Sequence, residues 1–162
     1  MTSIDSTPFE MLLAKATVWI TAEEQRVLRS GFPLAASQIA DATVVGIKCP
    51  ERVRLIQEEM IRLPPDSVLS EMARRLGMSD TSTFGRTYRY GIVIRWDHWG
   101  DRELLVHELV HTRQYEKFGS IENFLRPYLK ELLPPFRYPD GPLEQEARTI
   151  AATICRSKDD SR

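Results

Sequence analysis

The sequence contains few cysteines and no long apolar segment. Its two cysteines, Cys49 and Cys155, lie far apart and belong to no CxxC pair. This spacing argues against a thiolate zinc site, a redox pair and a disulfide scaffold. The longest apolar runs cover only a few residues, well below the roughly 20 that are needed to cross a bilayer. We therefore expect no transmembrane helix.

The sequence also lacks an excess of charge of either sign. It has 22 basic and 23 acidic residues, a formal net charge of -1, and no block of like charges. A nucleic-acid-binding protein usually has a basic stripe, because neutralising phosphates supplies most of its affinity. We therefore expect neither a nucleic-acid partner nor a membrane partner. Residues 1–20 carry an acid before any base and are amphipathic, unlike a signal peptide, so we expect a cytoplasmic protein.

Length and composition indicate one globular domain. The chain has 162 residues, of which 42% are hydrophobic and 28% charged, and this suits a single hydrophobic core. We expect residues 1–156 to form that domain, with an N-terminal helical part over 1–50. Residues 51–156 would hold a strand, a motif helix and a glutamate helix. Residues 157–162 would form a frayed tail.

Local patterns in the first half predict helices around one strand. Apolar residues at helical spacing predict a helix from Pro8 to Trp19. A capping box of Thr21 and Glu24 then predicts a second helix that ends near Gly31. The segment 33–42 adds one or two helical turns, and alternation over 52–57 predicts a strand. A further helix over 66–77 would have a serine or aspartate cap and end at Gly77.

The second half predicts one strand and three helices. Residues 85–96 alternate and are rich in β-formers, which predicts a strand with four residues on one face, Tyr88, Tyr90, Ile92 and Ile94. Gly91 could mark a bulge in it. Helices are expected from Asp101 to Gly119, over 121–133 with a bend at Pro127, and over 142–155. The fold class is therefore mainly helical α+β with a small antiparallel sheet.

The segment HELVH, residues 107–111, carries the chemistry of this chain. On a helix, His107 and His111 lie about 40° apart on one face, so both imidazoles can reach one metal ion. Glu108 lies about 100° round from His107, where it can contact a water on the metal without being a ligand. A catalytic zinc site needs a third protein ligand and one open position.

Three residues could supply the third ligand. His98 stands nine residues before His107, and Glu144 and Glu146 open the last helix. The extended motif H-E-x-x-H-x-x-G-x-x-H is absent, because Gln114 and Lys117 occupy its glycine and last histidine positions, which excludes the metzincin layout. Helical geometry alone does not choose between the two glutamates, since they diverge by about 200° and both flank an apolar stripe.

The stretches GIVIRWDHWGDRELLVHELVHTRQYEKFG and YPDGPLEQEA resemble the gluzincin class of zinc metallopeptidases, in particular a family of small, uncharacterised bacterial proteins. The resemblance covers residues 85 to about 151. It implies a minimal gluzincin core, in which a strand, the motif helix and a glutamate helix form the zinc site.

The resemblance also bears on the choice of glutamate. In relatives such as the prenyl-protein and heat-shock membrane metallopeptidases, the ligand stands in the pattern E-x-x-A-D. Glu144 stands three residues before Ala147 and matches this pattern, whereas Glu146 does not. The resemblance thus implies zinc bound by His107, His111 and Glu144. Arg148 replaces the aspartate that would orient a histidine in relatives, so either another group does this here or the site is weaker.

The expected function is zinc-dependent hydrolysis, with a peptide or protein as substrate. Glu108 would be the general base that activates the metal-bound water. An alternative is an inactive zinc-binding or protein-interaction module on the same scaffold, in which the N-terminal helices or the 134–141 loop fill the groove. A third alternative is hydrolysis of a non-peptide amide or ester, which the same chemistry permits.

Several further roles stay open at this point. Gln114 shares the histidine face, where it could bond to a neighbouring helix or orient a ligand. Tyr138 and His98 are candidates for the donor to the developing oxyanion. The strand GIVIR could be a sheet edge on which a substrate peptide lies, or it could be fully paired.

Overall fold

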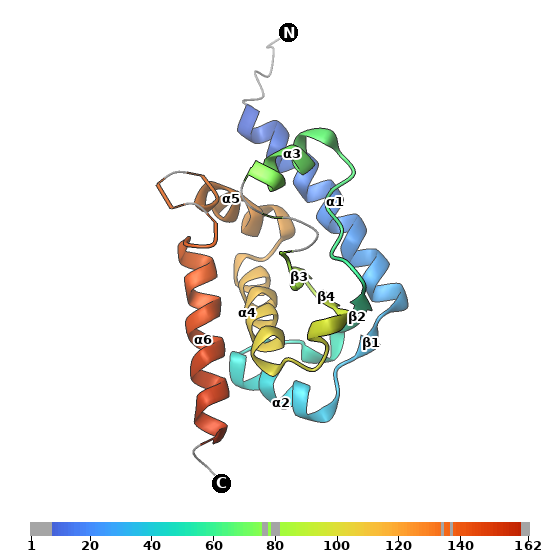
Figure 1. Cartoon of the computed structure of the whole chain (residues 1–162), viewed down its shortest axis with the longest axis vertical. Coiled ribbons are helices and arrows are strands. Elements are labelled where there is room, and N and C mark those ends of the chain that lie inside the picture. Colours follow the sequence, from blue (N-terminus) through green and yellow to red (C-terminus); the bar gives the residue numbers. More distant parts are fainter. Residues whose placement is uncertain (1–7, 76–77, 79–81, 134, 137, 160–162) are drawn as a thin grey trace.

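A four-stranded mixed sheet lies at the centre of the computed structural model (Figure 1), which describes residues 8–75, 78, 82–133, 135–136 and 138–159. Its strands are β1 (Phe32–Pro33), β2 (Arg54–Glu58), β3 (Gly85–Tyr88) and β4 (Gly91–Arg95), in the order β1-β2-β4-β3. The outer pairings are antiparallel as expected, but β2 and β4 are parallel. The chain crosses over between β2 and β4, so the expectation of a wholly antiparallel sheet was wrong.

Residues 85–96 form a hairpin and not one strand. Arg89 has a φ of 58° between β3 and β4, and this left-handed conformation reverses the chain. The period-2 pattern continues through the turn, which is why the reversal is not visible in it. Tyr88 consequently packs on one face of the sheet and Ile92 on the other. Gly91 begins β4, where an added Cβ would come within 2.8 Å of Val27.

The helices cover both faces of the sheet (Figure 1). They are α1 (Pro8–Ser30), α2 (Ala36–Val45), α3 (Ser67–Arg75), α4 (Arg102–Phe118), α5 (Ile121–Glu131) and α6 (Pro142–Asp159), with 3-10 turns η1 (Pro50–Arg52) and η2 (Trp96–His98). On one face, Ile56 and Val93 pack with α1 and α5. On the other, Leu55 and Ile92 pack with α2, α4 and α6. The fold is therefore mainly helical α+β.

Helix α1 is continuous where a break was expected. The hydroxyl of Thr21 donates to the carbonyl of Thr17 inside the helix, at 2.7 Å, and does not cap a new one. The buried side chains of Leu13, Ile20 and Val27 continue one apolar face across this point, so packing against the sheet outweighs the capping signal. Helix α1 is thus part of the core.

Other helix ends are set by local hydrogen bonds. Asp66 caps α3 by accepting from the backbone N–H groups of Val68 and Leu69. The expected end of that helix, Gly77, lies outside the described residues. Helix α6 extends to Asp159, beyond residue 156 where we expected the domain to end, and residues 160–162 of the expected tail are not described.

The motif helix α4 begins and ends as the sequence predicts. Asp101 accepts a hydrogen bond from the N–H of Leu104 at 3.0 Å, and Gly119 ends the helix with a φ of 85°. Within the described part of the chain, no helix has the length and apolar character that spanning a membrane would require. Helix α4 lies between the sheet and α6 (Figure 1), so its residues can meet side chains from both.

Candidate metal centre

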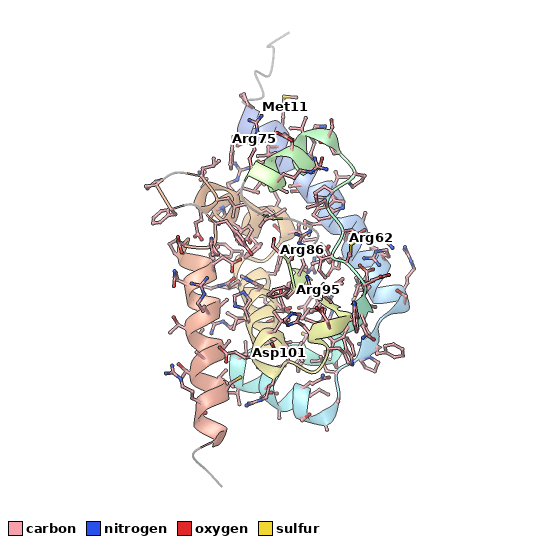
Figure 2. All side chains as sticks on the ribbon, in the orientation of Figure 1. Met11, Arg62, Arg75, Arg86, Arg95 and Asp101 are labelled. Carbon is pink, nitrogen blue, oxygen red and sulfur yellow. The ribbon has the colours of Figure 1, made fainter. Side chains whose placement is uncertain are left out.

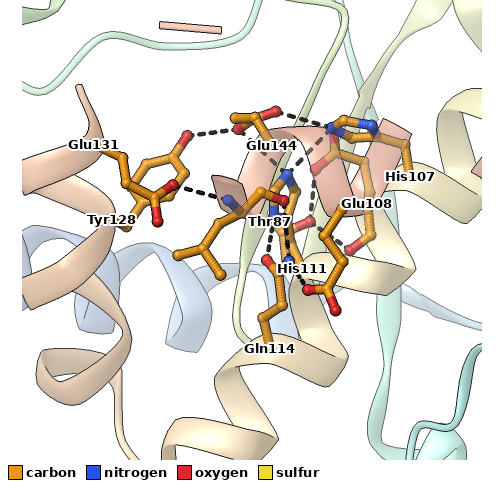
Figure 3. A network of polar contacts seen from close by, with 10 residues as sticks. Thr87, His107, Glu108, His111, Gln114, Tyr128, Glu131 and Glu144 are labelled. Atoms are coloured by element: carbon orange, nitrogen blue, oxygen red, sulfur yellow. Dashed lines mark hydrogen bonds and ion pairs between the residues drawn. The ribbon is translucent and has the colours of Figure 1, made fainter. Parts of the chain in front are cut away.

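Helices α4 and α6 bring two histidines and one glutamate together (Figure 3). His107 and His111 stand one turn apart on α4, and their Nε2 atoms are 3.1 Å apart. Glu144, in the first turn of α6, places Oε2 3.2 Å from Nε2 of His107 and Oε1 3.4 Å from Nε2 of His111. His111 and Glu144 are buried, and His107 is half-buried.

These separations fit a tetrahedral metal site. With metal–ligand bonds of about 2.0–2.1 Å, two neighbouring ligand atoms of a tetrahedron lie about 3.3 Å apart. The shortest separations between the three side chains, 3.1, 3.2 and 3.4 Å, are each close to this value, with Oε2 of Glu144 nearest to His107 and Oε1 nearest to His111. One ligand atom from each side chain lies within 4.8 Å of the other two. Two imidazoles and a carboxylate, with one ligand position left over, could therefore hold a metal ion.

Gln114 fixes the orientation of His111 and the tautomer of its neutral ring. The amide nitrogen of Gln114 donates to the carbonyl of Leu143 at 3.0 Å and to Oε2 of Glu146 at 2.7 Å. Because a carbonyl can only accept, this assigns the Gln114 amide and leaves its oxygen to accept from Nδ1–H of His111, at 2.8 Å. When His111 is neutral, its lone pair is therefore on Nε2, which faces His107 and Glu144.

The structure separates the two candidate glutamates. Glu144 faces the histidines, and the hydroxyl of Tyr128 donates to its Oε1 at 2.8 Å. Glu146 accepts from Arg113 at 2.6 Å and from Gln114, so it lies behind the centre and not in it. Gln114 thus has both of the roles that the sequence left open. It forms hydrogen bonds with α6, and it also orients His111.

The centre attracts a cation. Burial alone would lower the pKa of His111, but its hydrogen bond to Glu144 and the charge of that carboxylate raise the pKa to about 9. For Glu144, burial acts to raise the pKa, and the hydrogen bonds from His107 and His111 outweigh it and hold the pKa well below its usual range. The raised pKa favours the protonated form of His111 at neutral pH in the metal-free chain, so a metal ion would compete with a proton for Nε2.

Glu108 lies beside the centre and against strand β3. Its side chain is buried, and the hydroxyl of Thr87 donates to its Oε2 at 2.6 Å (Figure 3). A Cβ added to Gly85 would lie only 2.9 Å from Oε1 of Glu108, so the absent side chain of this glycine makes room for the carboxylate. Two residues of β3 therefore set the position of Glu108.

A cavity of about 160 Å³ adjoins these residues. His107, Glu108, His111 and Glu144 line it, together with mostly apolar side chains from α1, α3 and α5. Trp19 contributes to the wall from α1 and Tyr138 from the segment before α6. The described parts of the N-terminal helices and of the 134–141 loop thus border the cavity and do not fill it.

Of the two candidates for the oxyanion donor, one lines this cavity and the other does not. Tyr138 lines the cavity, and burial, followed by the charges of Glu144 and Glu108, raises its pKa to about 12. His98 lies elsewhere, because its ring stacks on Phe84 with centroids 4.1 Å apart. It does not join the group of possible metal ligands among the described residues.

Sequence reasoning missed Tyr128 and Thr87. Tyr128 stands four residues after Phe124 on an amphipathic helix, a pattern that indicates a core residue. Thr87 is one of several β-formers in its strand. Nothing in either local pattern points to a carboxylate far along the chain.

The strand GIVIR, β4, is not a sheet edge. It pairs with β2 on one side and β3 on the other, so the fully paired alternative is correct. The edge is β3. Because the N–H of Arg95 donates to the carbonyl of Phe84, the antiparallel alternation turns the backbone groups of Gly85 and Thr87 away from β4.

Comparisons with known proteins do not assign a family. No family model, curated protein or solved structure matches the chain. The resemblance to gluzincins therefore stays a prediction from residues 85 to about 151.

Proposed function

We propose that this protein is a zinc-dependent hydrolase that cleaves peptide bonds. The observation that supports it best is the convergence of His107, His111 and Glu144 at separations near those of a tetrahedral site. A second carboxylate, Glu108, lies next to this group in the same cavity. Two imidazoles and a carboxylate are a ligand set of known zinc peptidases.

Each residue has a defined task in such a reaction. Zinc, when bound, would supply a Lewis acid that polarises the substrate carbonyl and lowers the pKa of water to about 7. Glu108 would accept a proton from the attacking water and deliver it to the leaving amine. Thr87 holds one oxygen of Glu108 and leaves the other to make this contact. Tyr138 is the candidate donor to the developing oxyanion.

Strand β3 offers a place for the substrate backbone. Its outward backbone groups, at Gly85 and Thr87, belong to the same residues that position Glu108. A peptide that pairs with this edge would bring its own backbone close to the centre.

The cavity favours a hydrolase over an inactive interaction module. A scaffold that only binds partners has no need for a hollow beside the metal ligands, or for a buried carboxylate there, which costs free energy. The apolar lining also suits a side chain flanking a scissile bond. A non-peptide amide or ester would use the same chemistry, and a substrate panel would separate these classes.

Metal content of the purified protein, measured by elemental analysis, tests the proposal. We expect about one zinc per chain in the wild type, in Glu146→Gln and in Glu108→Gln, and a loss of zinc in Glu144→Gln. Glu108→Gln should also reduce peptide hydrolysis by about 100-fold or more. A wild type that binds no zinc even after reconstitution would overturn the proposal. Zinc bound without hydrolysis of any peptide, amide or ester would indicate the interaction module.

A further inference from the structure

Arg86 is the one residue with a permanent positive charge among the described residues that line the cavity. It belongs to β3, next to Gly85 and Thr87, and Figure 2 shows it near the centre of the view, whereas Arg75 lies at the end of the molecule formed by α3. One of its terminal nitrogens donates to the carbonyl of Arg62 at 2.8 Å. Its guanidinium also forms a hydrogen bond with the hydroxyl of Tyr88. A guanidinium has five donors in a planar fork, so it can hold both bonds and still bind an anion.

Arg86 and the three possible metal ligands line the same cavity. The half-buried Tyr138 lines the same cavity; burial raises its pKa to about 12, the charges of Glu144 and Glu108 add to this, and the charge of Arg86 opposes it. Arg86 also stands 5.7 Å from the ring centroid of Trp19, another cavity residue. A ligand in the cavity would therefore meet the metal ligands at one point and a guanidinium at another.

The size of the cavity limits what else the ligand can carry. Its volume of about 160 Å³ is close to that of an engineered cavity of about 150 Å³ that holds benzene. The apolar wall comes from three helices and includes Ile20, Met72, Leu125 and Leu129. One aromatic or branched side chain fits this space.

We propose that the enzyme removes C-terminal residues with large apolar side chains, and that Arg86 binds the terminal carboxylate of the substrate. This rests on the proposed hydrolase function. A guanidinium fork and a carboxylate can form two parallel hydrogen bonds, and the apolar wall receives the side chain of the same residue. Arg86 is in this role a specificity-determining residue of the site.

The reaction needs no co-reactant other than water. The C–N bond of the last peptide unit breaks, and the oxygen of water becomes part of the new carboxylate on the shortened peptide. The departing amine keeps its electron pair and receives the proton that Glu108 carries. The products are a shortened peptide and a free apolar amino acid.

Ligand binding can test Arg86 without any hydrolysis. The probes are N-acetyl-L-phenylalanine, its C-terminal amide and N-acetyl-L-alanine, titrated calorimetrically into zinc-loaded and metal-free protein. We expect the wild type to bind the phenylalanine acid about tenfold or more tightly than the amide, and more tightly than the alanine acid. Arg86→Gln should lose the preference for the acid, and the exposed control Arg75→Gln should keep it.

Comparing the zinc-loaded and metal-free protein shows whether Arg86 or the metal causes a preference for the acid over the amide. A preference for the acid in metal-free wild type, lost in Arg86→Gln, supports the proposal even if the protein proves unable to hydrolyse peptides. A preference that appears only with zinc and survives in Arg86→Gln would mean that the metal binds the carboxylate, and would overturn it. Equal binding of acid and amide by the wild type, or of alanine and phenylalanine acids, would also overturn it. If Arg86→Gln does not fold, Arg86→Lys keeps the charge without the fork and should show a reduced preference.

Discussion

The side-chain oxygen of Gln114 lies 2.8 Å from Nδ1 of His111, and this hydrogen bond determines which imidazole nitrogen can bind a metal. The same amide is anchored to α6 through the carbonyl of Leu143 and through Glu146. Gln114 thereby couples the motif helix to the helix that carries Glu144. It thereby orients the His111 ring, the task that the sequence left to a group other than Arg148.

Replacing Gln114 should weaken metal binding. The Gln114→Met variant has a similar volume but no acceptor for Nδ1–H of His111, so the ring loses its orientation. We expect zinc affinity to fall about 10- to 100-fold, measured by competition with a chelator of known affinity. The matched control is Gln145→Met, because Gln145 is exposed on α6. Equal affinities of Gln114→Met and the wild type would contradict this role.

The hydroxyl of Tyr128 should contribute to the affinity of the site. Tyr128→Phe removes the donor to Oε1 of Glu144, and the carboxylate then lacks one of the contacts that orient it. We expect about tenfold weaker zinc binding. Tyr115→Phe is the control, since Tyr115 is also buried and packs on the same Phe124 ring but has no such contact with Glu144. Similar losses in both variants would show that the effect comes from packing alone.

Thr87 should affect turnover and not metal content. Thr87→Val keeps the shape of the side chain and removes the hydroxyl that donates to Glu108, so the general base is held less firmly. We expect kcat to fall about tenfold or more, a part of the 100- to 10,000-fold that general base catalysis can supply, while bound zinc is unchanged. Thr87→Ser should retain most of the activity because it keeps the hydroxyl. A loss of zinc in Thr87→Val would contradict the assignment.

Zinc binding should strengthen as the pH rises. Although burial opposes it, Glu144 raises the pKa of His111 to about 9 in the metal-free chain, so zinc must displace a proton at neutral pH. The apparent affinity should increase up to about tenfold per pH unit and level off above about pH 9. Chelator competition between about pH 6 and pH 10 measures this, and an affinity that is flat from about pH 7 to pH 9 would contradict it.

The same shift predicts the stability of the metal-free protein. Because the folded pKa of His111 lies above the ordinary value of 6.5, its contribution is fully present below about pH 6.5 and is lost as the pH rises through about 9. The melting temperature of the metal-free protein, measured by thermal unfolding, should therefore fall as the pH rises from about 6.5 to about 9. Bound zinc should remove that dependence.

Two errors in the predicted fold arise because a local pattern does not record the structure around it. The alternation over 85–96 is real, but Arg89 reverses the chain within it, and the pattern is the same for one strand and for a tight hairpin. The capping box at Thr21 is also a real local signal. It is overruled because Leu13, Ile20 and Val27 bury one continuous helical face against the core.

The sequence by itself determined the motif helix and its two histidines. Asp101, Gly119 and the four-residue spacing of His107 and His111 act within one helix, so local rules are sufficient to place both rings on one face. The mainly helical α+β class also followed from patterns of this kind.

Only the tertiary structure decided the rest of the site. Glu144 and Glu146 both flank the apolar stripe of α6, and only packing against α4 and α5 turns the first toward the histidines and the second toward Arg113. The contact between Thr87 and Glu108 joins residues 21 positions apart, and that between Gln114 and Glu146 joins residues 32 apart. Such contacts depend on how whole elements pack, because no periodicity within a single helix or strand records its neighbour.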